Sequence, residues 1–146
     1  MAQTPGMLGF TSLKQCVMHN DIPFCRSNMT QASFEFFDRF VSYKLMPCLP
    51  TDFVYAGEQS VNGYTIVKST MPAGGGRDYI FRLVFVNTPG GMKIDIPATF
   101  QVGFGEKWRD KIALSEQLFL MMRQNMGNKL TCDMINDLIK PQNAKN

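Results

Sequence analysis

The sequence predicts one domain of the α+β class, in which a four-stranded antiparallel meander is preceded by one long helix and followed by two helices packed on one face. Three observations predict this class. Aromatic residues recur at spacings of three and four between residues 31 and 45, turn signals divide residues 52–104 into four runs, and two more helical patterns follow residue 106. The chain has 146 residues, of which 45% are hydrophobic, so it is long enough to build its own core.

The chain is expected to divide into three parts. Residues 1–29 show little periodicity and contain a proline and two glycines near their start, so they are expected to form an irregular arm. Any helix in this arm should be short and capped by Thr11 or Ser12. Residues 30–141 form the single α+β domain. Residues 142–146 are polar and are expected to fray.

The first long helix is predicted over residues 31–45. Thr30 is a favourable N-cap because its hydroxyl can accept a hydrogen bond from a free backbone amide. Pro47 ends the helix because proline lacks the backbone donor and restricts the residue before it. The apolar residues of this helix form one stripe, which is most simply explained as core: Phe34, Phe37, Val41 and Leu45.

Four strands are predicted between residues 52 and 104. They comprise residues 53–60, 64–71, 78–87 and 92–104. Asn62-Gly63 lies between the first two strands and suits a type I′ hairpin turn, which needs positive φ at both central residues. The third strand is apolar on nearly both faces, so we expect it to be central in the sheet. Arg82 is charged in the middle of that strand, and it is either an anchor for a ligand or a side chain on the wet face.

An alternation of apolar and polar residues predicts the fourth strand, which should have one buried and one exposed face. The odd positions face water or a partner, and Lys93, Asp95 and Gln101 among them are candidate interaction residues. Pro97 cannot donate a ladder hydrogen bond, so the strand is expected at an edge or with a bulge. The even positions are expected to face the helices: Met92, Ile94, Ile96, Ala98, Phe100, Val102 and Phe104.

Two helices are predicted at the end of the chain, over residues 107–126 and 132–140. Gly127 suits a left-handed cap after the first of them, and Thr131 suits the N-cap of the second. Trp108 lies in a basic and aromatic cluster and is a further candidate interaction residue. Acidic residues interrupt that cluster and the net charge is only +3, so no nucleic-acid partner is predicted.

The four cysteines favour two disulfides because their number is even and their spacing is wide. Cys16 is paired with Cys25 because the two are close in sequence, and Cys48 with Cys132 follows by elimination. Disulfides favour an oxidising compartment, so we expect the protein to be periplasmic or secreted. The alternative is a cytoplasmic protein with four buried thiols. No apolar run reaches the roughly 18 residues that a membrane-spanning helix needs.

Residues able to carry chemistry are few. His19 is the single histidine and lies in no nucleophile motif, the carboxylates form no motif, and the cysteines lack metal-site spacing. No catalytic residue, cofactor or metal is therefore predicted. The first hypothesis is a non-enzymatic binding or assembly module that acts on another protein or on itself, because only 18% of residues are charged while Phe and Met are abundant. The alternative is a carrier of an apolar small molecule held between sheet and helices. A hydrolase whose carboxylates meet only in space comes third.

Overall fold

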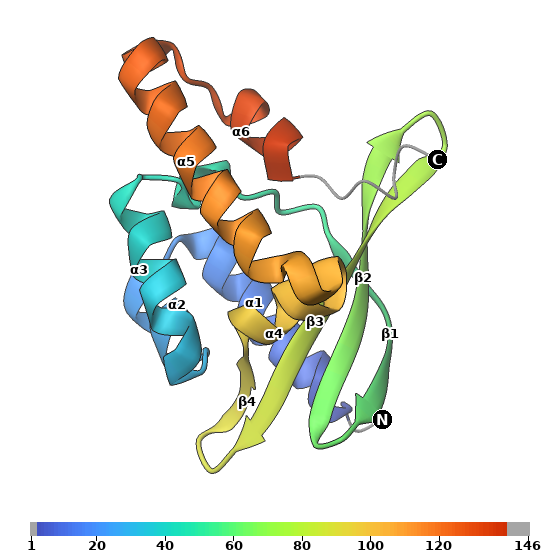
Figure 1. The fold of residues 1–146 in the computed structure, drawn as a ribbon. Helices are drawn as coiled ribbons and strands as arrows, with labels where there is room; N and C mark the ends of the chain where they lie inside the picture. Colours follow the sequence, from blue (N-terminus) through green and yellow to red (C-terminus); the bar gives the residue numbers. More distant parts are fainter. Residues whose placement is uncertain (1–2, 140–146) are drawn as a thin grey trace.

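A computed structural model describes residues 3–139 and has the α+β architecture that the sequence predicts (Figure 1). Three helices precede the sheet: α1 (Pro5–His19), α2 (Ile22–Ser27) and α3 (Phe34–Ser42). The strands are β1 (Val54–Val61), β2 (Tyr64–Gly74), β3 (Arg77–Thr88) and β4 (Gly91–Ile94). The helices α4 (Ile96–Phe104), α5 (Trp108–Met126) and α6 (Cys132–Ile139) follow.

The sheet is an antiparallel meander with the strand order β1-β2-β3-β4. Asn62 and Gly63 have φ angles of 49° and 84°, so the first hairpin has the backbone that its turn sequence predicts. Pairing of β1 with β2 is interrupted between Tyr55 and Glu58, where Gly57 has a φ of 131°. Such an irregularity bends a strand and increases its twist, which helps the sheet to curl around α1.

Residues 3–29 are largely helical, in contrast to the irregular arm that the sequence predicts. The cap of α1 is Thr4, whose side chain accepts a hydrogen bond from the Met7 amide, and not Thr11 or Ser12. The glycines of this segment serve close packing: a Cβ added at Gly9 would lie 2.7 Å from a carbon of the Phe85 ring. Gly9 therefore lets α1 approach β3 more closely than any other residue would allow.

The predicted fourth strand is wrong beyond Ile94, because residues 96–104 form α4. The Asp95 side chain accepts a hydrogen bond from the Ala98 amide, and Pro97 occupies the first turn of the helix, where its missing donor costs nothing. The Thr99 hydroxyl accepts a hydrogen bond from the Val84 amide at 3.0 Å. Helix α4 thus supplies a hydrogen-bond partner for the backbone of β3, at the edge where a longer fourth strand would have paired.

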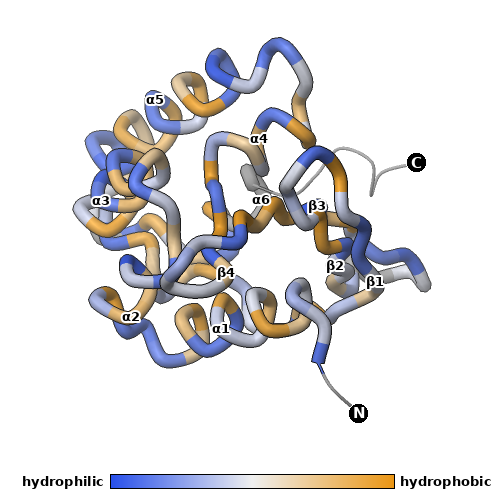
Figure 2. The backbone as a smooth tube through the Cα atoms, turned by 90° about the horizontal axis from the view of Figure 1, so that it is seen from below, coloured by the Kyte–Doolittle hydropathy of each residue, from blue (hydrophilic) through white to orange (hydrophobic). Residues whose placement is uncertain are grey.

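The helices lie on both sides of the curled sheet. Helix α1 contacts all four strands, and Figure 2 shows it inside the curve of the sheet, with α4 and α5 beyond the other side. The main core lies between α1 and the sheet and includes Phe10, Val67 and Phe85. A smaller core joins α5 and α6 to the segment after α3 and consists of Leu45, Cys48, Phe119 and Ile135.

Both predicted disulfides are found, and they account for all four cysteines. Cys16–Cys25 joins α1 to α2, with a Cα–Cα distance of 5.0 Å. Cys48–Cys132 spans 84 positions of sequence and joins the turn Met46–Cys48 to the first residue of α6. The second disulfide therefore attaches the C-terminal helices to the rest of the chain.

The carboxylate of Glu58 holds the N-terminal end of α1 against β1. It accepts hydrogen bonds from the Tyr55 hydroxyl at 2.6 Å, from the Gly6 amide at 3.1 Å and from the Thr4 hydroxyl. Burial alone would raise the pKa of Glu58, but the hydrogen bonds from Thr4, Tyr55 and the Gly6 and Met7 amides outweigh it and lower that pKa below 4.5. The ionised carboxylate is thus favoured in the folded state, beside the positive end of the helix dipole.

We expect Glu58→Gln to lower the free energy of unfolding by about 1–2 kcal/mol at neutral pH, because hydrogen bonds to a charged group are lost. The pKa of Glu58 is lowered on folding, so this difference should be complete above pH 4.5 and should disappear as the pH falls through the folded-state pKa. Urea unfolding of the two proteins over a pH series measures it. Glu35→Gln, which removes an exposed carboxylate, is the control and should change stability by less than about 0.5 kcal/mol. A cost of Glu58→Gln that does not vary with pH would show that the charge plays no part.

Candidate functional site

A cavity of about 560 Å³ lies between α1, the inner face of the sheet, residues 49–53 and the start of α6. This volume falls within the range of pockets that hold small molecules. Its walls are mostly apolar: Leu13 and Val17 of α1, Met71 of β2, Phe81 and Leu83 of β3, and Ile94 of β4. Leu49, Pro50, Phe53 and Pro72 complete the apolar lining.

The local periodicity of each element explains why these side chains share one space. Leu13 and Val17 are four residues apart on α1 and therefore lie on the same helix face. Phe81 and Leu83 are two residues apart on β3 and point to the same side of the sheet. Ser69 of β2 is the register partner of Phe81, so it lies on that side as well.

Among the described residues, three polar side chains line the cavity, and they differ in burial. Ser69 is only 1% exposed, and its hydroxyl donates a hydrogen bond to the Val54 carbonyl at 3.0 Å. Asp52 and Asp133 are exposed, so they mark the mouth where the cavity meets solvent. Lys14 is near this region, but its ammonium group donates to the Phe53 carbonyl at 2.7 Å. The cavity thus has an apolar interior and an acidic mouth.

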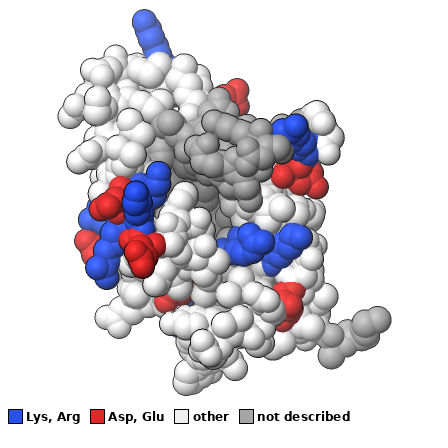
Figure 3. Space-filling model, turned by 45° about the vertical axis from the view of Figure 1, so that its right-hand side comes forward, with Lys and Arg blue, Asp and Glu red and all other residues white. Residues whose placement is uncertain are grey.

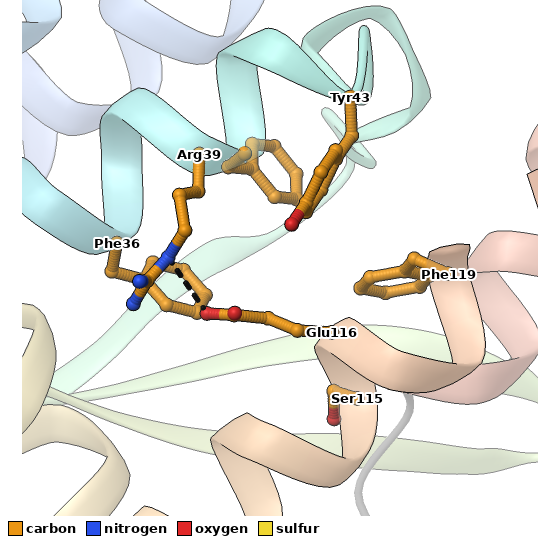
Figure 4. Close-up of a pocket in the computed structure, with 7 residues that line it drawn as sticks. Phe36, Arg39, Tyr43, Ser115, Glu116 and Phe119 are labelled. Atoms are coloured by element: carbon orange, nitrogen blue, oxygen red, sulfur yellow. Dashed lines mark ion pairs between the residues drawn. The ribbon is translucent and has the colours of Figure 1, made fainter. Parts of the chain in front are cut away.

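A second, much smaller hollow lies between α3 and α5 (Figure 4). Its volume is about 10 Å³, which is room for about one water molecule. Arg39 of α3 reaches across it and forms an ion pair with Glu116 of α5 at 3.2 Å, while Tyr43 and Phe119 close its other side. This contact fastens α5 to α3 and leaves no space for a larger ligand.

Arg82 does not reach the cavity, although it is a candidate anchor. It is exposed and lies between Phe81 and Leu83 in sequence, so it points to the opposite face of the sheet. Its register partner there is Lys68, which is also exposed. Figure 3 shows separate groups of Lys and Arg side chains, several with Asp or Glu beside them, on a largely uncharged surface.

The other candidate interaction residues are dispersed over three elements. Lys93 lies in β4, Gln101 is exposed on α4, and Trp108 is the half-buried first residue of α5. Asp95 is the N-cap of α4, which gives its carboxylate a structural role. None of the four lines the cavity.

The cavity residues themselves were not singled out by the sequence patterns. The apolar ones are indistinguishable from ordinary core residues, since both show the same helix and strand periodicity. Asp52 and Asp133 lie in a loop and in a first helical turn, where acidic residues are common for other reasons. The sequence indicated only the location of such a site in general terms, between a curled sheet and the helices that cover it.

The described residues hold neither a cluster of metal ligands nor a helix suited to a membrane span. No cluster of three or more His, Cys, Asp or Glu side chains that could hold a metal ion is found in the part of the chain that the structure describes. Within residues 3–139, no helix combines the length and the hydropathy that crossing a membrane requires. Searches of protein-family models, curated proteins and solved structures found no match to this chain.

Proposed function

We propose that this protein is a non-catalytic carrier that holds an apolar small molecule between α1 and the sheet. The observation that supports the proposal is the cavity of about 560 Å³ with apolar walls on four elements. Apolar walls that an apolar ligand covers are removed from water, which is favourable. A ligand that fills the cavity would therefore stabilise the protein.

A carrier suits the polar groups of the cavity better than an enzyme does. The buried hydroxyl, Ser69, is hydrogen-bonded to a backbone carbonyl, whereas a nucleophilic serine needs a base within reach. Hydrolysis through assembled carboxylates would use Asp52 and Asp133, yet both are exposed at the mouth. A carboxyl group that acts as a general acid usually lies in less polar surroundings.

We further propose that the carrier works in an oxidising compartment, either the periplasm or the extracellular space. Two disulfides support this proposal, because such bonds persist where thiols are not kept reduced. The Cys48–Cys132 bond fixes α6, whose Asp133 lies at the cavity mouth. The shape of the mouth would therefore depend on the oxidised state.

We expect Val17→Trp to weaken the binding of an apolar ligand by at least about tenfold, because the larger side chain fills the cavity that Val17 lines. Met18→Trp is the matched control: Met18 follows on the same helix, is 55% exposed and does not line the cavity. Titration with an apolar fluorescent dye measures both affinities, and native mass spectrometry reveals any molecule that copurifies. Equal dye affinities in the two variants would place binding outside the cavity.

A second candidate function, protein–protein interaction, is favoured by the surface of α5. Phe119 is the one residue of this 19-residue helix that is buried, while Leu114, Leu120 and Met121 are 42–55% exposed. Exposed apolar side chains on one helix are typical of contact surfaces. The native mass spectra used for ligand detection also report dimers and larger assemblies, so one measurement separates the two functions.

A further inference from the structure

We infer that the cavity selects ligands that carry a protonated amine at the end of an apolar body. This inference rests on the proposed carrier function and specifies the chemistry of its ligand. It follows from the polar groups of the lining, which within the described residues are two carboxylates and one hydroxyl. No Lys, Arg or His is found among the described lining residues.

The hydroxyl of Ser69 takes no part in this selection. It donates to the Val54 carbonyl at 3.0 Å, and the side chain is only 1% exposed, so a ligand in the cavity meets a closed wall at this position. The polar groups that a head group can reach are therefore the two carboxylates, which are exposed.

The carboxylates of Asp52 and Asp133 place negative charge at the mouth from two separate elements. Asp52 lies in the loop before β1, and Asp133 lies in the first turn of α6. Neither forms an ion pair with a described basic residue. The nearby ammonium group of Lys14 donates to the Phe53 carbonyl and keeps its positive charge, so two negative charges stand against one positive charge in this region. The mouth therefore attracts a cation and repels an anion.

The three head-group classes differ in how they meet this lining. An ammonium group offers three donors and a positive charge, an alcohol offers one donor, and a carboxylate offers neither a donor nor a favourable charge. The net charge of the whole chain is +3, so unspecific attraction would favour the carboxylate instead. A preference for the amine would thus oppose the overall charge and would arise from the local site.

The test uses three probes with the same alkyl chain: dodecylamine, dodecanol and dodecanoate. Calorimetric titration at neutral pH, below the concentrations at which the probes aggregate, gives their affinities. We expect the amine to bind about fivefold more tightly than the alcohol, since partly exposed ion pairs are individually weak, and the carboxylate to bind least. In the double variant Asp52→Asn with Asp133→Asn, amine and alcohol should bind equally, with the alcohol affinity unchanged. Asp110→Asn, on the exposed part of α5, should leave the preference intact.

The head-group preference and the carrier function fail in different ways in this experiment. If dodecanoate binds as tightly as dodecylamine, or if the double variant keeps the amine preference, the head-group assignment is wrong while a carrier remains. If Val17→Trp leaves amine binding unchanged, the amine binds at the surface and the assignment is also wrong. If none of the three probes binds the unaltered protein, the carrier function itself is overturned.

Discussion

Replacing both cysteines of the Cys48–Cys132 disulfide with alanine is expected to lower the free energy of unfolding by about 4–5 kcal/mol. The bond closes a loop of 84 positions, and the entropy that a cross-link removes from the unfolded chain grows with the length of the loop. The bond also anchors helices that bury few side chains, since Phe119 is the one buried residue of α5. Without the disulfide, α5 and α6 remain attached through the small core around Leu45, the Arg39–Glu116 ion pair, the hydrogen bond from Arg123 to the Tyr43 carbonyl and the packing of α5 on α4.

The Cys16–Cys25 disulfide provides a matched comparison. Its sequence separation is 9, for which the same chain-entropy relation gives about 2–3 kcal/mol. Cys16, Cys25 and Cys48 are buried whereas Cys132 is exposed, so lost packing should cost at least as much in the Cys16–Cys25 variant. A larger cost of the Cys48–Cys132 variant would therefore report on loop length. Urea unfolding followed by far-UV circular dichroism measures both costs. If the Cys16–Cys25 variant is as unstable as the Cys48–Cys132 variant, the loop explanation fails, and the bond within α1 and α2 must hold native-state structure.

Features that depend on a few neighbouring residues could be predicted well from the sequence. Asn62-Gly63 requires positive φ angles and gave the correct hairpin, and the apolar pattern of residues 107–126 gave α5 to within one residue. The disulfide pairing also followed from sequence distance and elimination. In each case, local geometry or counting leaves few alternatives.

Residues 92–104 show why periodicity alone is insufficient. Their alternation is compatible with a strand, but the backbone is decided at Asp95, which caps a helix, and at Pro97, which fits its first turn. The prediction followed the alternation because it extends over thirteen residues, whereas the helix signals are only Asp95 and Pro97. Gly9 misleads in a similar way, because a glycine that allows close packing resembles one that breaks a helix.

The cavity could not be predicted residue by residue because it depends on curvature. Val17, Leu83 and Ile94 carry the same pattern whether their side chains meet or leave a space between them. The bend of β1 near Gly57 and the position of α1 decide which of these occurs. Both are properties of the assembled sheet, so a pattern of apolar positions indicates the lined face but not its volume.

Replacing Phe85 with alanine is expected to lower the free energy of unfolding by about 3–5 kcal/mol. Its ring is 1% exposed and packs directly under Gly9 of α1, so truncation leaves a void between the helix and the sheet. Little relaxation can fill that void, because α1 is fixed at one end by Glu58 and at the other by the Cys16–Cys25 bond. Urea unfolding of the variant measures the loss.

Phe104→Ala is the control that distinguishes the observed fold from the predicted strand. In a strand over residues 92–104, Phe104 would share the face of Ile94, which is buried, and its truncation would cost as much as that of Phe85. In α4 the ring is 43% exposed and contacts Phe100 at a centroid distance of 5.8 Å, so we expect a cost of about 1 kcal/mol or less. Comparable costs for the two phenylalanines would therefore argue for an extended fourth strand and against the helix that covers the edge of β3.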